Sequence, residues 1–258
     1  MADPALNNLS SKQPAAFLGG AVIGTLGGLI GLGGAEFRLP LLIGPFGFAA
    51  LEAVILTKAM SLVVVAFALQ IAAHWPIIVN LLAGSLAGAW LGAGWATRLK
   101  SETLYKVIAV LLLMIAVVLV FGHDIAAGSA LVTGTAQIMA GVVAGLVIGI
   151  VASLLGVAGG ELLIPTLILL FGADIKLAGS LSLAVSLPTM IVGFARYSRD
   201  QSFAVLKNNR TFLLAMAAGS ILGAFIGGQL LGIVPSAVLL PGLASILVIS
   251  AFKVWRHA

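Results

Sequence analysis

The chain has 258 residues, of which 61% are hydrophobic and only 8% charged, and its formal net charge is +5. A soluble domain carries about 25% charged residues, and disordered chains are polar and highly charged. The composition therefore excludes both classes. Because a helix that crosses a bilayer needs about 20 apolar residues, we expect an all-α polytopic membrane protein.

The composition also excludes several kinds of catalytic and metal-binding site. The chain has no cysteine, which rules out disulfides, redox pairs and thiolate ligands. Its histidines, His74, His123 and His257, are far apart and lack metal-binding spacing. We therefore expect no enzyme, no catalytic residue, no cofactor and no metal. The positive charge fits basic cytoplasmic loops, so no nucleic-acid partner is expected.

The N-terminal residues 1–14 are polar, and Lys12 is their only basic residue. A signal peptide would have a basic start, a shorter apolar core and a small-residue cleavage site. These features are missing, so we expect the first apolar segment to be part of the mature protein, with a cytoplasmic N-terminal tail at 1–14 before it.

Ten apolar stretches follow in chain order, and two of them are too short to cross about 30 Å of hydrocarbon. These two, at 37–48 and 162–171, occupy the same place in each half of the chain. The eight long stretches are 15–32, 53–73, 77–96, 104–121, 130–155, 177–194, 212–233 and 237–254.

The two halves of the sequence match each other directly. Pro165 lies 125 residues after Pro40, and this offset holds without a gap between residues 20–61 and 145–186. Seventeen of these 42 pairs are identical, whereas composition alone would give about one in ten. Glycines spaced by four residues recur at an offset of 135, with Gly84, Gly88 and Gly92 matching Gly219, Gly223 and Gly227. This is an internal duplication.

The duplication defines the domain organisation. We expect transmembrane repeat 1 at 15–121, a linker at 122–129, transmembrane repeat 2 at 130–254 and a cytoplasmic C-terminus at 255–258. The glycine stripes are small-residue faces of the kind that pack helices together. Tryptophans near segment ends are expected to anchor the chain at the membrane interface, and they are Trp75, Trp90, Trp95 and Trp255.

Basic residues indicate how the repeats face the membrane. Repeat 1 carries Arg98, Lys100 and Lys106 between its last two long stretches, and the equivalent loop of repeat 2, at 232–236, has none. Repeat 2 has its basic residues one loop earlier, and they are Arg196, Arg199, Lys207 and Arg210. Because basic loops are cytoplasmic, equivalent loops face opposite sides, and we expect inverted repeats.

Inversion requires an odd number of crossings in each repeat. About three long helices per repeat give an odd number of membrane crossings if the first stretch and the short piece together enter and leave on the same side of the membrane. Five full crossings per repeat would give the same parity. In both arrangements we expect a multi-pass protein of the inner (plasma) membrane with N- and C-termini in the cytoplasm.

Each repeat contains a break at which glycines precede a proline. The segments are GLGGAEFRLP at 31–40 and GVAGGELLIP at 156–165. Glycines followed by a proline predict an unwound or re-entrant helix, whose freed backbone groups must line a cavity. A helix that restarts there points N–H groups and a positive dipole end inward, which suits an anion. Interrupted segments at matching places are typical of a transporter's binding site.

These doubled segments carry a resemblance. The repeated G-x-G-G-x-x-x-x-x-P element, the two-half layout and the size resemble the TauE/SafE sulfite exporter family of transmembrane permeases, over about residues 15–254. The usual glycine run departs at Ala35 and at Ala158, and Arg38 lies outside the pattern. The resemblance implies a secondary transporter of a sulfur oxyanion or organosulfonate, such as sulfite or sulfoacetate.

The residues expected to bind the substrate surround the two breaks. An intramembrane carboxylate is costly unless it is functional or paired, although a helix N-terminus also favours one. The two glutamates are therefore the proton-coupling candidates as well. The full set is Gly33, Gly34, Glu36, Arg38, Thr57, Lys58, Ser61, Gly159, Gly160, Glu161, Ser182 and Ser186.

Two of these residues are cations that occur in repeat 1 only. Arg38 and Lys58 stand opposite Leu163 and Leu183 in repeat 2. They attract an anion, pair with acidic neighbours such as Glu36, or extend to the cytoplasmic surface. The hydroxyl residues match pairwise between the repeats and serve either substrate binding or contacts between helices.

We therefore predict alternating access, in which the halves rock about a site between the breaks. Proton coupling would use Glu161, which lacks basic residues at the matching positions, with Glu36 in a more structural or substrate-ordering role. The expected partners are a small anionic substrate and the lipid bilayer, and the sequence leaves open both a monomer and a homodimer. A passive anion channel, a membrane-embedded enzyme and an assembly factor are the alternatives that the residues leave open.

Overall fold

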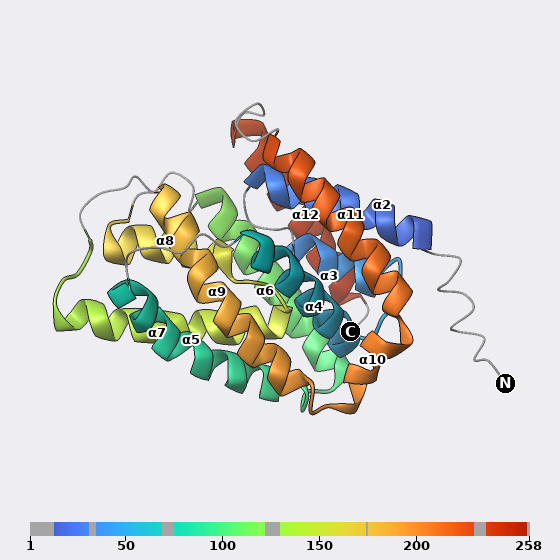
Figure 1. Cartoon of the computed structure of the whole chain (residues 1–258), viewed down its shortest axis with the longest axis horizontal. Coiled ribbons are helices and arrows are strands. Elements are labelled where there is room, and N and C mark those ends of the chain that lie inside the picture. Colours follow the sequence, from blue (N-terminus) through green and yellow to red (C-terminus); the bar gives the residue numbers. More distant parts are fainter. Residues whose placement is uncertain are drawn as a thin grey trace.

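The computed structural model describes residues 13–30, 35–68, 75–121, 130–173, 175–229 and 236–256. Side chains are described in these ranges except at 27–30, 35–36, 61–68, 119–121, 175–176, 180, 228–229 and 236–240. All regular elements in these ranges are helices (Figure 1). They are α2 (Gln13–Ile30), α3 (Ala35–Ile43), α4 (Ala50–Ala68), α5 (Trp75–Ala96), α6 (Ser101–Phe121), α7 (Thr135–Leu155), α8 (Gly160–Phe171), α9 (Ile175–Tyr197), η1 (Gln201–Phe203), α10 (Ala204–Asn208), α11 (Arg210–Gln229) and α12 (Ser236–Trp255).

The prediction of an all-helical polytopic membrane protein is confirmed. Within the described residues, five helices are long and apolar enough to cross a bilayer. The spans are Trp75–Ala96, Ser101–Val118, Thr135–Leu155, Leu177–Tyr197 and Arg210–Gly227. The two short pieces are also confirmed as short, since α3 has 9 residues and α8 has 12.

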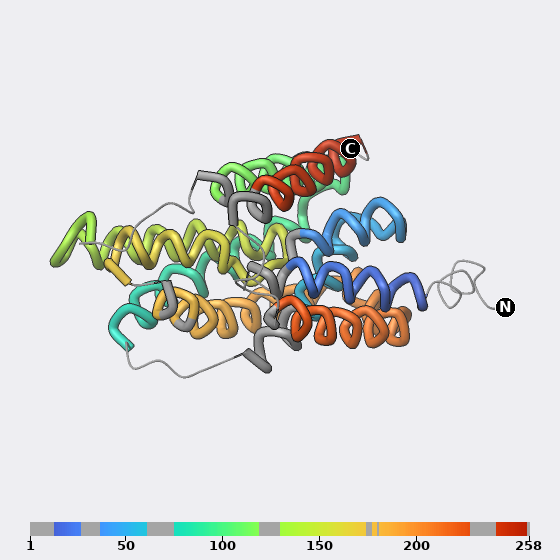
Figure 2. Tube along the Cα trace, turned by 90° about the horizontal axis from the view of Figure 1, so that it is seen from above, coloured from blue at the N-terminus to red at the C-terminus, as the bar shows by residue number. Residues whose placement is uncertain are grey.

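Three long helix pairs join one repeat to the other. Helix α2 packs along α11, α5 along α7, and α6 along α12. Figure 1 and Figure 2 show the members of each pair side by side although they are far apart in the sequence. The two sequence repeats are therefore interleaved in space and do not form two separate bodies.

Glycines allow the closest contacts between paired helices, in α5 against α7 and in α11 against α2. A methyl group on Gly88 of α5 would collide with the carbonyl oxygen of Leu146 in α7. One on Gly223 of α11 would collide with the carbonyl oxygen of Ala21 in α2. Gly88 and Gly223 are equivalent in the two repeats, and so are Leu146 and Ala21. The stripes are confirmed as helix-packing faces, and the same contact is made twice with the repeats exchanged.

The contacts define two four-helix units. The α9 unit consists of α7, α8 and α9 of repeat 2 together with α5 of repeat 1. The α4 unit consists of α2, α3 and α4 of repeat 1 together with α11 of repeat 2. Helices α4 and α9 contact each other between the units, and Figure 2 shows α6 and α12 along one flank. Each unit thus borrows one helix from the opposite repeat.

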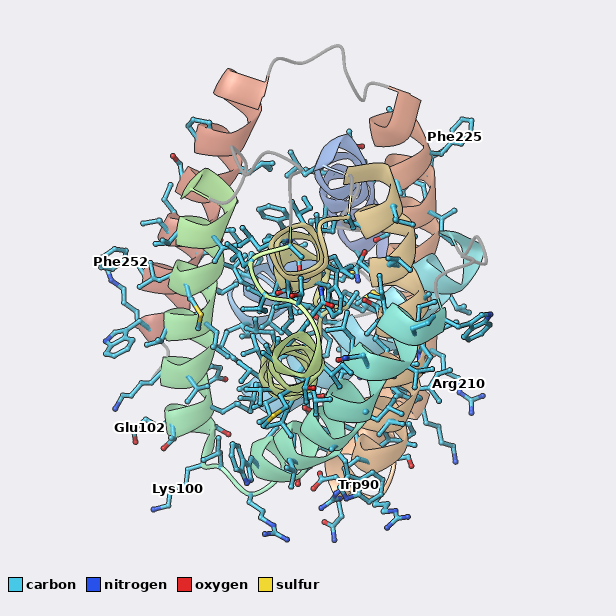
Figure 3. All side chains as sticks on the ribbon, turned by 90° about the vertical axis from the view of Figure 1, so that its left-hand side faces the viewer. Trp90, Lys100, Glu102, Arg210, Phe225 and Phe252 are labelled. Carbon is cyan, nitrogen blue, oxygen red and sulfur yellow. The ribbon has the colours of Figure 1, made fainter. Side chains whose placement is uncertain are left out.

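The charged side chains concentrate toward one end of the long helices. Figure 3 shows Lys100, Glu102 and Trp90 toward this end, whereas Phe225 lies toward the opposite end. Helix α11 begins at the exposed Arg210 and runs toward Phe225. Large apolar side chains such as Phe225 and Phe252 are exposed on the outer faces of the long helices, as expected of surfaces that face lipid.

Candidate functional site

The break in repeat 2 separates α7 from α8. Helix α7 ends where Gly156 adopts the left-handed conformation, with φ of 71°, which glycine tolerates without strain. The N–H groups of Gly156 and Val157 bond back to the carbonyls of Ser153 and Ala152, at 3.2 Å and 3.0 Å, and close the helix with a Schellman motif. Gly159, with φ of 83°, then starts α8. Glycine geometry therefore makes this break.

The proline has a different place from the one that the sequence suggests. Pro165 lies inside α8, and Pro40 lies inside α3. Neither is part of the unwound segment: each is the sixth residue of its helix, where a proline leaves the carbonyl four residues earlier without its helical hydrogen bond. In α8 that residue is Glu161, to whose carbonyl Pro165 has no N–H to donate.

Glu161 lies in the first turn of α8 and its residue surface is 7% exposed. Its N-cap, Gly159, packs against Ala152 near the end of α7. The positive end of the α8 dipole favours a carboxylate at this position. Gly160, the first residue of α8, is also buried. The structure therefore places a carboxylate inside the protein at the break, as the sequence predicts.

Lys58 reaches this break from the other unit. Its side chain is fully buried, and Nζ donates to the carbonyl of Ala152 at 3.3 Å and to Oγ of Ser153 at 3.4 Å. The last carbonyls of a helix carry partial negative charge, so they stabilise an ammonium group. The side chain therefore does not extend to the membrane surface, which was one of the three roles that the sequence allows for it.

Helix α9 completes the surroundings of Lys58. The hydroxyl of Tyr197, which is fully buried, donates to the carbonyl of Ser153 at 2.8 Å. A methyl group on Gly193 would lie 2.9 Å from Cε and 3.0 Å from Nζ of Lys58. A residue with a side chain at Gly193 would thus displace the lysine. Helices α4, α7 and α9 meet at this point, where the α4 unit contacts the α9 unit.

Arg38 is the second buried cation. It lies on α3, is fully buried, and its Nη1 donates to the carbonyl of Thr57 in α4 at 3.5 Å. Thr57 precedes Lys58 in α4, so Arg38 contacts the backbone of α4 one residue before Lys58. Oγ1 of Thr57 is buried without a hydrogen-bond partner in the described part of the chain. An unsatisfied hydroxyl inside a protein costs about 1 to 3 kcal/mol and leaves a donor for a ligand.

The hydroxyl residues of α9 make two kinds of contact, within the helix and to a neighbouring helix. Ser182 and Ser186 are both buried, and Ser182 donates to the carbonyl of Gly179 in its own helix at 2.8 Å. Oγ1 of Thr189 donates to the carbonyl of Val185 and lies 2.7 Å from Oγ of Ser85 in α5. The Ser85–Thr189 pair therefore holds α5 against α9, which is the helix-contact role of such residues.

Part of the predicted site lies outside the described residues. Gly33 and Gly34 fall in the gap between α2 and α3, and the side chains of Glu36 and Ser61 are not described. Among the described residues, no group of three or more histidine, aspartate or glutamate side chains could hold a metal ion. The structure places Lys58 at the end of α7 and Arg38 against the carbonyl of Thr57, the residue before Lys58, whereas Glu161 lies in the first turn of α8.

Sequence reasoning missed three residues at this point. Tyr197, Gly193 and Ser153 surround Lys58, yet none of them lies in the doubled motif. Gly193 and Tyr197 also lie beyond residue 186, where the matching of the repeats at constant offset ends. The one available indication was a tyrosine within a basic segment, 196–199, at the end of an apolar stretch.

Comparison with known proteins identifies the family. A model of the family described as sulfite exporter TauE/SafE matches residues 16–254, which is nearly the whole chain. Comparisons with curated proteins and with solved structures give no match. The family consists of membrane transporters of sulfur compounds, so the apolar helices and the match describe the same multi-pass membrane protein. The chain belongs to the TauE/SafE sulfite exporter family.

Proposed function

We propose that the chain is a secondary transporter that moves a small sulfur oxyanion or organosulfonate across the inner membrane by alternating access. The observation that carries this proposal is a pair of fully buried cations: Lys58 bonds to the end of α7 in the opposite repeat, and Arg38 bonds to the carbonyl of Thr57, one residue before Lys58. Buried cations are costly in a membrane protein unless they serve a function. An oxyanion offers the charge and the acceptor oxygens that guanidinium and ammonium groups bind.

The substrate would bind between the two units. Arg38 and Lys58 come from the α4 unit, whereas the α7–α8 break and Glu161 belong to the α9 unit. In this proposal Oγ1 of Thr57 donates to a substrate oxygen, and the N–H groups at the start of α8 face the anion. Ser182 and Ser186, on the buried face of α9, complete the lining together with Gly159 and Gly160.

The moving bodies would be the two interleaved units and not the two sequence repeats. Each unit is held together by a glycine-mediated pair, α5 with α7 or α2 with α11, in which the backbones touch. Such contacts cannot slide without a collision, so each pair should move as one body. Rocking of the α4 unit against the α9 unit would then open the site to either side in turn.

We further infer that the repeats are inverted, with both termini in the cytoplasm. Ser85 meets Thr189 and Trp90 meets Arg196, so α5 and α9 run in the same direction. Helix α11 follows α9 through η1 and α10 and returns beside α4. These contacts support opposite directions for the equivalent helices α5 and α11. The basic residues between α9 and α11 support a cytoplasmic position for that connection.

A flux assay tests the proposal. Purified protein in liposomes should take up labelled sulfite or a labelled alkanesulfonate with saturation, and unlabelled substrate on the opposite side should accelerate the exchange. Lys58→Met should lower uptake by at least about tenfold, because an ion-binding contact of about 1.4 kcal/mol or more is lost. Lys106→Met is the matched control, since Lys106 pairs with Glu102 at the surface. Uptake that never saturates would indicate a channel, and substrate turnover without net flux would indicate an enzyme.

A further inference from the structure

We propose that Arg196 and Arg199, held on the ring of Trp90, form a binding site for the phosphate group of an anionic phospholipid. Cζ of Arg196 lies 5.6 Å from the centroid of the Trp90 ring, and Cζ of Arg199 lies 5.0 Å from it. One indole of α5 therefore carries two guanidinium groups from α9 and the turn that follows it. This site is separate from the helix break and from the buried cations.

The arrangement is built by the packing of α5 against α9. Arg196 lies in the last turn of α9 and is half-buried. A methyl group on Gly94 would lie 3.5 Å from both Nε and Nη2 of Arg196, which is an ordinary contact distance, so the guanidinium group lies against α5. Arg199, three residues further on, is exposed. The pair thus presents the N–H donors of two guanidinium groups beside one indole ring.

The charge of this pair has no acidic partner in the part of the chain that the structure describes. The surface ion pair of Lys106 with Glu102 lies within α6 and does not involve either arginine. Asp200, the neighbour of Arg199, accepts a hydrogen bond from the N–H of Ser202 at 2.9 Å and so caps η1. Two cations that share one ring repel each other, and an anion placed between them removes that repulsion. The planar donor forks of arginine match the oxygens of a phosphate group.

The location favours a lipid as the source of that phosphate. Trp90 and Trp95 are 39% and 51% exposed near the end of α5, where tryptophan marks the membrane–water interface. Ile191, which is 53% exposed, lies five residues before Arg196 toward the apolar part of α9 and would contact an acyl chain. Basic pockets between transmembrane helices are known to bind anionic headgroups. The phosphate would therefore sit at the level of Trp90 with its acyl chains along α9.

Titration of the purified protein with lipid tests this site. In detergent, phosphatidylglycerol should raise the melting temperature, whereas phosphatidylcholine with the same acyl chains should raise it less. The double variant Arg196→Gln/Arg199→Gln should bind phosphatidylglycerol about tenfold or more weakly, because charge-assisted hydrogen bonds are lost. The matched control is Lys207→Gln/Arg210→Gln, which removes two exposed basic residues from the same connection without touching the ring. It should keep the affinity of the unaltered protein.

Three results would overturn the proposal. Equal weakening of phosphatidylglycerol binding in both double variants would indicate a general effect of positive charge. An equal rise in melting temperature with inorganic phosphate alone would indicate a site for a free anion. If the double variant fails to fold, the single variant Arg199→Gln tests the site in its place. Arg199 is exposed, and its removal leaves the contact of Arg196 with Gly94 intact. Full retention of phosphatidylglycerol by Arg199→Gln in native mass spectrometry would then contradict the site.

Discussion

Lys58 of repeat 1 donates from Nζ to the carbonyl oxygen of Ala152 in repeat 2, at a distance of 3.3 Å. The contact places an ammonium group at the C-terminal end of α7 and joins the α4 unit to the α9 unit. Because the carbonyls at this helix end carry partial negative charge, they offset part of the cost of burying the cation. A movement of one unit against the other would have to break this contact, so it should stabilise one conformation of the transport cycle.

The first prediction concerns Gly193, which makes room for Lys58. In Gly193→Ala the new methyl group would lie 2.9 Å from Cε of Lys58, closer than carbon atoms pack. The lysine should be pushed off the end of α7, with a loss of about 1 to 3 kcal/mol of stability and reduced uptake. Thermal unfolding of the purified protein and uptake into liposomes measure the two effects.

Gly179→Ala is the matched control for Gly193→Ala, because Gly179 lies on the same helix and has nothing within 4 Å of the added methyl group. It should leave both stability and uptake unchanged. Gly193→Ala should cost less stability in a protein that already carries Lys58→Ala, because the collision is then absent. An equal cost of Gly193→Ala with and without Lys58, or equal loss in both glycine variants, would contradict the role given to Gly193.

The second prediction concerns Tyr197, whose hydroxyl donates to the carbonyl of Ser153. Tyr197→Phe keeps the ring and removes the donor, so one buried hydrogen bond is lost. The free energy of unfolding should fall by about 1 to 3 kcal/mol, while uptake per folded molecule should stay near that of the unaltered protein. Unchanged stability together with a large loss of uptake would instead place the hydroxyl in substrate binding.

The third prediction uses the reciprocal contacts of the repeats. Gly88→Ala and Gly223→Ala each force a methyl group into a backbone carbonyl of the neighbouring helix. Because the neighbours cannot give way, each variant should lose about 1 to 3 kcal/mol of stability, and the two losses should be similar. Gly242→Ala on α12 is the control, since nothing lies within 4 Å of its added methyl group. A loss at only one of the paired glycines would contradict the equivalence of the two helix pairs.

The sequence was sufficient to predict the features that occur in both repeats. Its apolar segments predicted the helices, and the glycine stripes at Gly88 and Gly223 predicted packing faces, because small residues at fixed spacing have one common use in membranes. The doubled motif also located the break, at which Gly156 and Gly159 take the left-handed conformation. Each of these features depends on local residue types, which a single sequence displays.

What the sequence could not predict depends on contacts between distant helices. Nothing in the pattern around Lys58 indicates that its partner is Ala152, 94 residues later in the chain. The exchange of α5 and α11 between the repeats is equally invisible, because periodicity identifies a packing face but not the helix that it meets. For the same reason Tyr197 was missed, although it lies beside a predicted site residue.

The fourth prediction tests the inverted topology in a chain that has no native cysteine. Single cysteines at Ser101 and Ser202 should react with a membrane-impermeant thiol reagent only from the cytoplasmic side. Ser101 is the first residue of α6, directly after the basic connection from α5, and Ser202 lies in η1, in the basic connection between α9 and α11. Cysteines at His123 and Ser236 should react only from the outside. Labelling of Ser101→Cys and Ser202→Cys from opposite sides would show that the repeats are not inverted.

The last prediction concerns the two glutamates that follow the breaks. Burial in apolar surroundings favours a neutral carboxylic acid, whereas the first turn of a helix favours the charged form. Glu161 is buried in the first turn of α8, and the positions that match Arg38 and Lys58 in its repeat are Leu163 and Leu183. We propose that Glu161 is the residue that carries the coupled proton.

We expect Glu161→Gln to remove the pH dependence of flux while expression and substrate exchange persist, because glutamine keeps the size of the side chain but cannot titrate. Glu36→Gln should instead lower substrate affinity or stability. The substrate should be an alkanesulfonate, which stays anionic throughout the neutral range, so that any pH dependence reports on the protein. Glu102→Gln is the control, since Glu102 is exposed and pairs with Lys106. Concentrative uptake by Glu161→Gln with an unchanged pH profile would exclude Glu161 as the proton carrier.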